Sequence, residues 1–142
     1  MGKIIWLTGN SGAGKTTLAY ALSDVLRGYV VLDGDEMRDS VSIGLGYSSE
    51  GRFEANMRVA RLAKVIAKQE YNVIIAVIAP FQSIRDEVEH LIDVDWVYLK
   101  RDSLGHRPDY PYEAPQGAFS LDIDTMTVRE EVEKVIAWHT HK

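Results

Sequence analysis

Four residues near the start of the chain have the types and the spacing of a phosphate-binding loop. They fill the pattern G-x-x-x-x-G-K-[ST] and are Gly9, Gly14, Lys15 and Thr16. Glycines let successive backbone N–H groups turn inward, and a helix that begins there adds its N-terminal dipole. The lysine would bridge the β and γ phosphates of a nucleoside triphosphate, and the threonine hydroxyl would bind Mg²⁺. The expected triphosphate-binding residues are Gly9, Asn10, Ser11, Gly12, Ala13, Gly14, Lys15, Thr16 and Thr17.

Two aspartates, Asp33 and Asp35, follow the second apolar run of the chain and are separated by one glycine. Because the carboxyl ends of parallel strands form the ligand crevice of an α/β sheet, these carboxylates should lie beside the phosphate loop. One carboxylate near Mg²⁺ and one that accepts a hydroxyl proton suit phosphoryl transfer to an alcohol. We therefore predict catalytic roles for Lys15, Asp33 and Asp35, with Thr16 and Asp33 at the metal. A surface turn capped by aspartates is the alternative.

The positions that carry this chemistry are set by alternating apolar runs and helical patterns. Short apolar runs bounded by turn residues are typical of strands covered on both faces, and strand–helix alternation indicates a parallel sheet between helical layers. The expected strands are residues 3–8, 29–32, 72–79, 95–99 and 119–123, and the expected helices are 15–26, 52–69, 82–92 and 127–139. The pattern predicts an α/β, three-layer fold with a parallel five-stranded sheet and helices on both faces.

Composition narrows the class of protein further. The 142 residues suit one domain, so we expect a single domain over 1–142. The chain has no cysteine, which excludes disulfides and thiolate metal sites. No run approaches the ~20 apolar residues of a membrane span. The formal net charge of −5 disfavours nucleic acid as a partner. We expect a cytoplasmic protein without a membrane partner that binds small molecules.

Six segments in order resemble the adenylylsulfate kinases over nearly the whole chain. They are "LTGNSGAGKTT", "LDGDEMR", "LGYSSEGRFEANMRVARLAK", "VIAPFQSIRDEV", "PYEAP" and "LDIDTMT". The resemblance implies a P-loop kinase fold that uses ATP and Mg²⁺ to phosphorylate the ribose 3′-hydroxyl of adenosine 5′-phosphosulfate, or a hydroxyl of a related anionic nucleotide-like acceptor. Family analogy also implies a homodimer.

The resemblance assigns further roles to individual residues. It implies that Asp35 positions or deprotonates the acceptor hydroxyl and that Arg38 and Arg52 grip the acceptor's anionic group. The remaining acceptor-side positions are Ile78, Ala79 and Pro80. On the ATP side, the resemblance implies Ala114 and Pro115 at the adenine. Arg101 and Arg107 are loop arginines, either of which can stack on adenine or touch phosphate.

The chain departs from the family on the acceptor side. Around Arg52 the family has Asp-Arg-x-Glu-Asn-x-Arg-Arg, and here Gly51, Ala55 and Met57 replace an Asp, an Asn and an Arg. We do not expect Asn56 to replace the missing Asn of position 55, because a shift of one residue along a helix rotates the side chain by about 100°. The family also has an Ile-Ser-Pro-Tyr-Arg segment. Here Ala79 replaces its serine and offers no hydroxyl, and Gln82 replaces its arginine and offers no charge. The segment 100–117, which we expect to be the lid and nucleotide loop, is much shorter than in the family.

Three function classes follow from these observations. The first is an ATP-dependent kinase that phosphorylates a hydroxyl of adenylylsulfate or, given the lost acceptor contacts, of a related molecule. The second is a kinase that acts on a nucleic-acid end or a modified base, against which the acidic charge weighs. The third is a non-catalytic nucleotide-binding module, disfavoured because Lys15, Thr16, Asp33 and Asp35 are all present.

Overall fold

The computed structural model describes residues 1–141 and contains one parallel five-stranded sheet. Its strand order is β2-β3-β1-β4-β5, and every neighbouring pair is parallel. The strands are β1 (Ile4–Thr8), β2 (Tyr29–Asp33), β3 (Asn72–Ala76), β4 (Asp95–Lys100) and β5 (Phe119–Asp122). The helices are α1 (Lys15–Val25), α2 (Gly34–Arg38), α3 (Ser49–Lys68), α4 (Gln82–Leu91) and α5 (Val128–Thr140), with short 3₁₀ turns η1 (Asp102–Leu104) and η2 (Ile123–Thr125).

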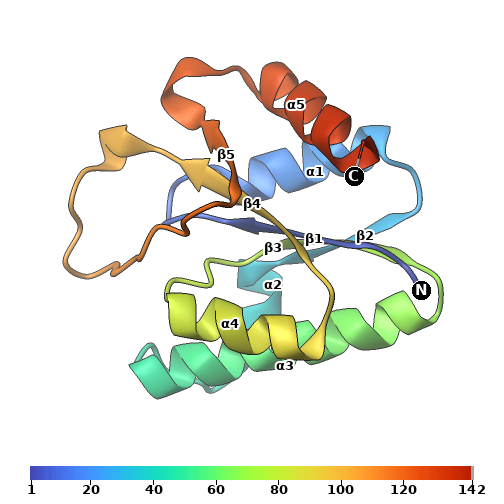
Figure 1. The fold of residues 1–142 in the computed structure, drawn as a ribbon. Coiled ribbons are helices and arrows are strands. Elements are labelled where there is room, and N and C mark those ends of the chain that lie inside the picture. Colours follow the sequence, from blue (N-terminus) through green and yellow to red (C-terminus); the bar gives the residue numbers. More distant parts are fainter. Residues whose placement is uncertain (142) are drawn as a thin grey trace.

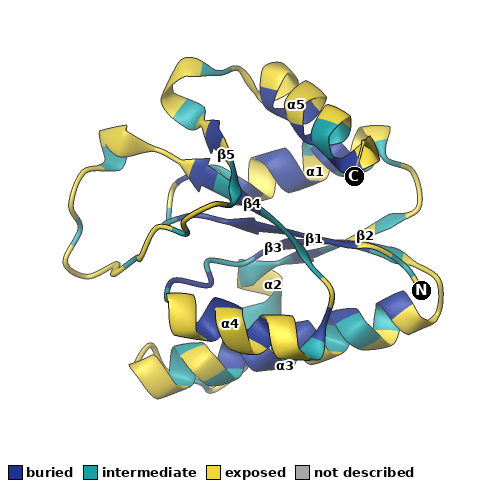
Figure 2. Ribbon diagram, viewed as in Figure 1, coloured by how far each residue is buried: buried dark blue, intermediate teal, exposed yellow. Residues whose placement is uncertain are grey.

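Helices cover both faces of the sheet, so the fold has three layers. In Figure 1, α1 and α5 lie above the sheet, and α2, α3 and α4 lie below it. The central strand β1 is buried at all five positions. Figure 2 shows the buried residues concentrated in the strands and on the helix faces that meet them. The predicted α/β fold is therefore confirmed.

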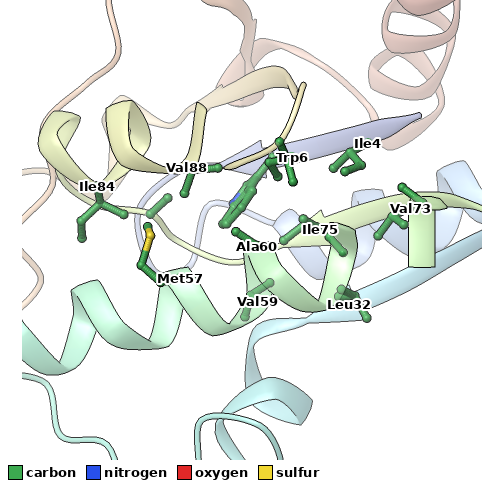
Figure 3. Close-up of a cluster of buried hydrophobic side chains, with 14 residues drawn as sticks. Ile4, Trp6, Leu32, Met57, Val59, Ala60, Val73, Ile75, Ile84 and Val88 are labelled. Carbon is green, nitrogen blue, oxygen red and sulfur yellow. The ribbon is translucent and has the colours of Figure 1, made fainter. Parts of the chain in front are cut away.

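Alternation along β1 divides the core into two clusters. Ile4 and Trp6 face α3 and α4, whereas Ile5 and Leu7 face α1 and α5. Figure 3 shows the Trp6 ring among side chains that α3 and α4 contribute, such as Met57 and Val88. Because β1, β2 and β3 are parallel, the loops that follow them all leave the sheet at its carboxyl edge.

Two element boundaries differ by three residues from the sequence prediction. The expected strand 72–79 ends at Ala76, because the chain then turns and Ala79 takes a left-handed conformation with φ of 47°. The helix expected from residue 52 begins at Ser49, since the Ser48 side chain accepts a hydrogen bond from the Gly51 N–H and caps it. The helix α2 was not predicted. Among residues 1–141, no helix is both long and apolar enough to cross a membrane.

Candidate active site

The loop between β1 and α1 has the backbone geometry that phosphate binding requires. Gly12 and Gly14 have φ of 87° and 96°, a region that favours glycine. A Cβ at Gly9 would lie 2.9 Å from the carbonyl oxygen of Leu99, so only glycine fits there. Helix α1 has no side-chain cap and no acidic residue in its first turn, so its N–H groups are open to an anion.

Lys15 is buried at the mouth of α1. Its Nζ donates a hydrogen bond to the Asn10 carbonyl at 2.9 Å, inside the loop. Burial lowers the pKa of Lys15 to about 8, because the charged ammonium loses hydration there. A triphosphate in the loop would restore a counter-charge to this ammonium.

Asp33 is the last residue of β2 and lies beside the start of α1. Its Oδ1 accepts a hydrogen bond from the Asp35 N–H at 3.1 Å, which caps α2, and lies 3.4 Å from the Thr16 hydroxyl. Mg²⁺ that binds a nucleotide typically takes one or two protein oxygens, several waters and the phosphates. The adjacent Thr16 and Asp33 oxygens fit that donor set, although residues 1–141 contain no cluster of three or more metal-ligating side chains.

A cavity of about 520 Å³ joins the phosphate loop to the predicted acceptor residues. Donor-side residues Asn10, Ser11, Gly12 and Lys15 line it together with Asp35, Arg38, Arg52, Ile78, Ala79 and Pro80. Thus every predicted acceptor-side residue borders the same space as Lys15. The remaining predicted loop residues belong to the adjacent loop and helix start and are Gly9, Ala13, Gly14, Thr16 and Thr17.

The two predicted anion-binding arginines differ in their contacts. Arg38 donates to the carbonyls of Leu45 and Gly46 at 2.8 and 3.1 Å and packs over the Tyr47 ring at 4.2 Å. The Arg52 guanidinium makes no hydrogen bond or ion pair within residues 1–141 and borders the cavity. Arg52 is therefore the cation with its donors open, and Arg38 is held by the loop before α3.

Buried polar groups hold the loop after β3 against the cavity. Trp6 Nε1 donates to the Val77 carbonyl at 2.9 Å, and the Thr8 hydroxyl donates to the carbonyl of Ile78. Arg85, which is 1% exposed, donates to the Ala79 carbonyl at 2.7 Å. A non-glycine residue at φ of 47° before a proline is strained, and these bonds keep it in place.

Arg85 also ties this loop to the segment that contains "PYEAP". Its Nη2 donates to the Glu113 carbonyl at 2.6 Å, and the Glu113 N–H donates to the Pro80 carbonyl at 2.7 Å. Tyr112 reaches the same place: its hydroxyl lies 2.8 Å from Thr8 Oγ1, and burial raises its pKa to about 12. The phenol therefore stays neutral and keeps its hydrogen bond.

The segment 100–117 lies across the phosphate loop. Arg101 donates to the Gly12 carbonyl at 2.6 Å, Arg107 donates to the Ser11 carbonyl, and Asn10 Nδ2 donates to the Tyr110 carbonyl at 3.0 Å. A second cavity, of about 310 Å³, lies between this segment and the loop and is lined by Arg101, Ala13 and Ala114. Pro115 lies outside both cavities, against a surface formed with Gln82 and Trp138.

Sequence reasoning missed several residues that shape the site. Tyr47 and Asn56 line the 520 Å³ cavity, although Asn56 was expected to point elsewhere. Arg85 and Tyr112 support it from behind. Only Asn56 carried a sequence signal, as a polar residue inside an otherwise apolar helix face; the others depend on contacts between distant segments.

The fold and this shared cavity define a P-loop kinase. The chain belongs to the adenylylsulphate kinase family, whose model matches residues 1–101. The predicted resemblance is therefore confirmed, and membership supports the expectation of an ATP-dependent phosphotransferase that uses Mg²⁺.

Two relatives that are named as kinases of this family align with more of the chain than the residues 1–101 that the family model matches. A probable adenylyl-sulfate kinase from Synechocystis sp. is 34% identical over 161 residues, covering 95% of this chain and 89% of that protein. A probable bifunctional SAT/APS kinase from Sorangium cellulosum is 36% identical over 163 residues, and this chain spans 28% of its length. The chain spans about half the length of two further curated relatives.

The similarity extends to solved structures. The APS kinase CysC of Mycobacterium tuberculosis has a TM-score of 0.82 and 27% identity, covering 96% of this chain and 95% of that one.

The Synechocystis alignment runs over 161 positions although this chain has 142 residues, so that relative carries residues that this chain lacks. The fold is shared, and the chain is a short version of it.

Proposed function

We propose that this protein is an adenylylsulfate kinase, which transfers the γ-phosphate of ATP to the ribose 3′-hydroxyl of adenosine 5′-phosphosulfate. The observation that carries the proposal is the single cavity that Lys15, Asp35 and Arg52 all line. A donor site and an acceptor site in one space are what in-line transfer needs. Family membership identifies adenylylsulfate as the first acceptor to test.

The donor side would work through backbone and charge. The loop N–H groups and the Lys15 ammonium would bind the β and γ phosphates and stabilise the charge that spreads over the transferred group. Thr16 and Asp33 would hold Mg²⁺, which would supply positive charge that neutralises the phosphates. Little covalent chemistry is required of the protein, so positioning and electrostatics supply most of the rate.

The acceptor side would orient the hydroxyl and fix the anion. Asp35 would accept the hydroxyl proton as the new O–P bond forms and ADP leaves. Arg52, whose donors are open, would bind the phosphosulfate through two parallel N–H bonds, and Arg38 would support it. Ile78, Ala79 and Pro80 would form the wall on which the rest of the acceptor packs.

We also propose that residues 1–142 act as a single kinase domain in which the segment 100–117 is a short lid and nucleotide loop. Arg101 and Arg107 support this proposal, because they already bond to the carbonyls of Gly12 and Ser11 beside the phosphate site. The second cavity, between Arg101 and Ala114, is a candidate adenine site. The homodimer implied by family analogy remains a prediction.

The proposal is tested by a screen of acceptors with ATP and Mg²⁺. We expect ADP formation that depends on adenosine 5′-phosphosulfate and proceeds at ~1–100 s⁻¹, as is typical of kinases. Adenosine 5′-monophosphate, other nucleotide 5′-anhydrides and single-stranded DNA serve as comparison acceptors. Turnover with another acceptor and none with adenylylsulfate would overturn the proposed substrate, and DNA phosphorylation would favour the nucleic-acid class.

A further inference from the structure

Asn56 is a polar residue on the buried face of α3. Only 3% of its surface is exposed, and its sequence neighbours Ala55 and Met57 are buried with it. Its Nδ2 donates to the Arg52 carbonyl at 2.8 Å. Its Oδ1 has no hydrogen-bond partner, and within residues 1–141 no other buried side-chain nitrogen or oxygen lacks one.

The bond to Arg52 fixes which way the amide faces. A backbone carbonyl only accepts hydrogen bonds, so the amide nitrogen must face it and the amide oxygen must be the free atom. The free atom therefore carries partial negative charge. Its complement is a neutral N–H or O–H donor rather than an anion.

An unpaired buried amide oxygen is unfavourable for folding. Asparagine is also a poor residue for a helix interior, because its side chain competes for backbone hydrogen bonds elsewhere. The neighbouring helix positions show that apolar side chains pack well on this face. A residue that is unfavourable for the local fold, as this asparagine is, is expected at functional positions.

Asn56 lies at the wall of the cavity, and its Oδ1 has almost no exposed surface in this structure. Asn56 lines the 520 Å³ cavity together with Ala55 and Ala79, which have small side chains. Asp35 and Arg52 line the same cavity. An acceptor bound there would thus present a hydroxyl to Asp35, an anion to Arg52 and another part of itself to Asn56.

We propose that Asn56 is a specificity-determining residue whose Oδ1 accepts a hydrogen bond from a neutral N–H or O–H group of the phosphoryl acceptor. The inference rests on the proposed function, since it takes this cavity to be the acceptor site. It defines the substrate class as a molecule with three features: a reacting hydroxyl, an anionic group and a separate neutral donor. That donor is either an amino group on a base or a second ribose hydroxyl.

The first test replaces Asn56 by leucine. For Asn56→Leu we expect a raised melting temperature without ligand, a KM for adenosine 5′-phosphosulfate raised about 5- to 30-fold, and an unchanged KM for ATP. A purely structural asparagine would give the opposite sign of stability change and no change in acceptor KM. Met57→Leu, at the next helix position but outside the cavity lining, is the matched control and should leave both KM values unchanged.

The second test identifies the donor. Adenosine 5′-phosphosulfate is compared with its analogue that lacks the 6-amino group and with its 2′-deoxy analogue. The analogue that lacks the bonded group should lose affinity with the wild type and lose none with Asn56→Leu. Equal losses for both proteins with both analogues would overturn the inference.

The design separates this inference from the proposed function. If the wild type does not use adenylylsulfate, the proposed substrate is wrong, and Asn56 is then judged by stability and binding. Calorimetric titrations with adenosine 5′-monophosphate and with purine riboside 5′-monophosphate would compare the wild type with Asn56→Leu. An unchanged melting temperature, or identical binding of both nucleotides to both proteins, would overturn the role of Asn56.

Discussion

The two halves of the cavity are built in different ways. The phosphate side comes from one continuous segment, residues 9–17, and its proposed binding groups are backbone N–H groups and one lysine. The acceptor side is assembled from α2, α3, the loop after β3 and the segment 100–117, and it depends on buried side chains such as Arg85 and Asn56. A site built from local backbone is little affected by substitutions elsewhere in the chain. In a site assembled from distant segments, single substitutions can change which substrate binds.

The largest effect is expected where the two halves meet, at Asp35. For Asp35→Asn we expect turnover to fall about 10²- to 10⁴-fold, because the amide cannot accept the hydroxyl proton. ATP affinity, measured by calorimetry, should be unchanged. Asp39→Asn, at the exposed end of the same helix, is the control and should retain full activity. Turnover that survives the Asp35 change would contradict the proposed mechanism.

On the phosphate side, Lys15→Ala should lower kcat about 10²- to 10³-fold, since it removes a charge aimed at the transferred group. The KM for the acceptor should change little, because Lys15 belongs to the other half of the cavity. Steady-state assays with each substrate varied in turn measure both. Undiminished kcat would mean that the buried ammonium does not act on the phosphates.

On the acceptor side, Arg52→Ala should raise the KM for adenosine 5′-phosphosulfate about 10- to 100-fold through loss of charge-assisted hydrogen bonds. Its melting temperature should stay the same, because the guanidinium has no partner within residues 1–141. Arg61→Ala, on the same helix but paired with Glu54 at 3.6 Å, is the matched control. A rise in the KM for ATP, without a rise in the KM for adenosine 5′-phosphosulfate, would contradict the assignment of Arg52 to the acceptor side.

The smallest predicted effect is a pH dependence confined to the phosphate side. Burial lowers the pKa of Lys15 to about 8, so the free protein loses this charge as pH rises through that value. ATP needs the protonated form, so its affinity should fall about tenfold between pH 7 and pH 9. Titrations in two buffers with different ionisation enthalpies should show proton uptake near pH 8. Lys15→Arg, which stays charged, should show neither effect.

The phosphate half could be predicted from sequence because its causes are local. Gly12 and Gly14 adopt left-handed conformations that depend on residue type, and the order of strands and helices follows from periodicity. Asp33 and Asp35 were placed by the rule that strand ends share one edge of a parallel sheet. Each of these inferences needs only local sequence patterns and one general rule about parallel sheets.

The acceptor half could not be predicted to the same depth, because its causes are contacts between distant segments. Nothing near Arg85 in sequence indicates that it bonds to both Ala79 and Glu113. The rotation argument against Asn56 assumed that only one helix position can face the cavity, yet both Ala55 and Asn56 line it. Pro115 was placed by resemblance, and here it lies on a different surface.

The most direct test of the proposed reaction is kcat/KM for adenosine 5′-phosphosulfate at saturating ATP and Mg²⁺. A working acceptor half, despite Ala55, Ala79 and the short segment 100–117, predicts a value within the usual enzyme range of about 10⁴ to 10⁸ M⁻¹s⁻¹. Tight ATP binding without any acceleration of ADP release by adenylylsulfate would contradict it. That result would leave the phosphate half intact and the acceptor half serving a different molecule.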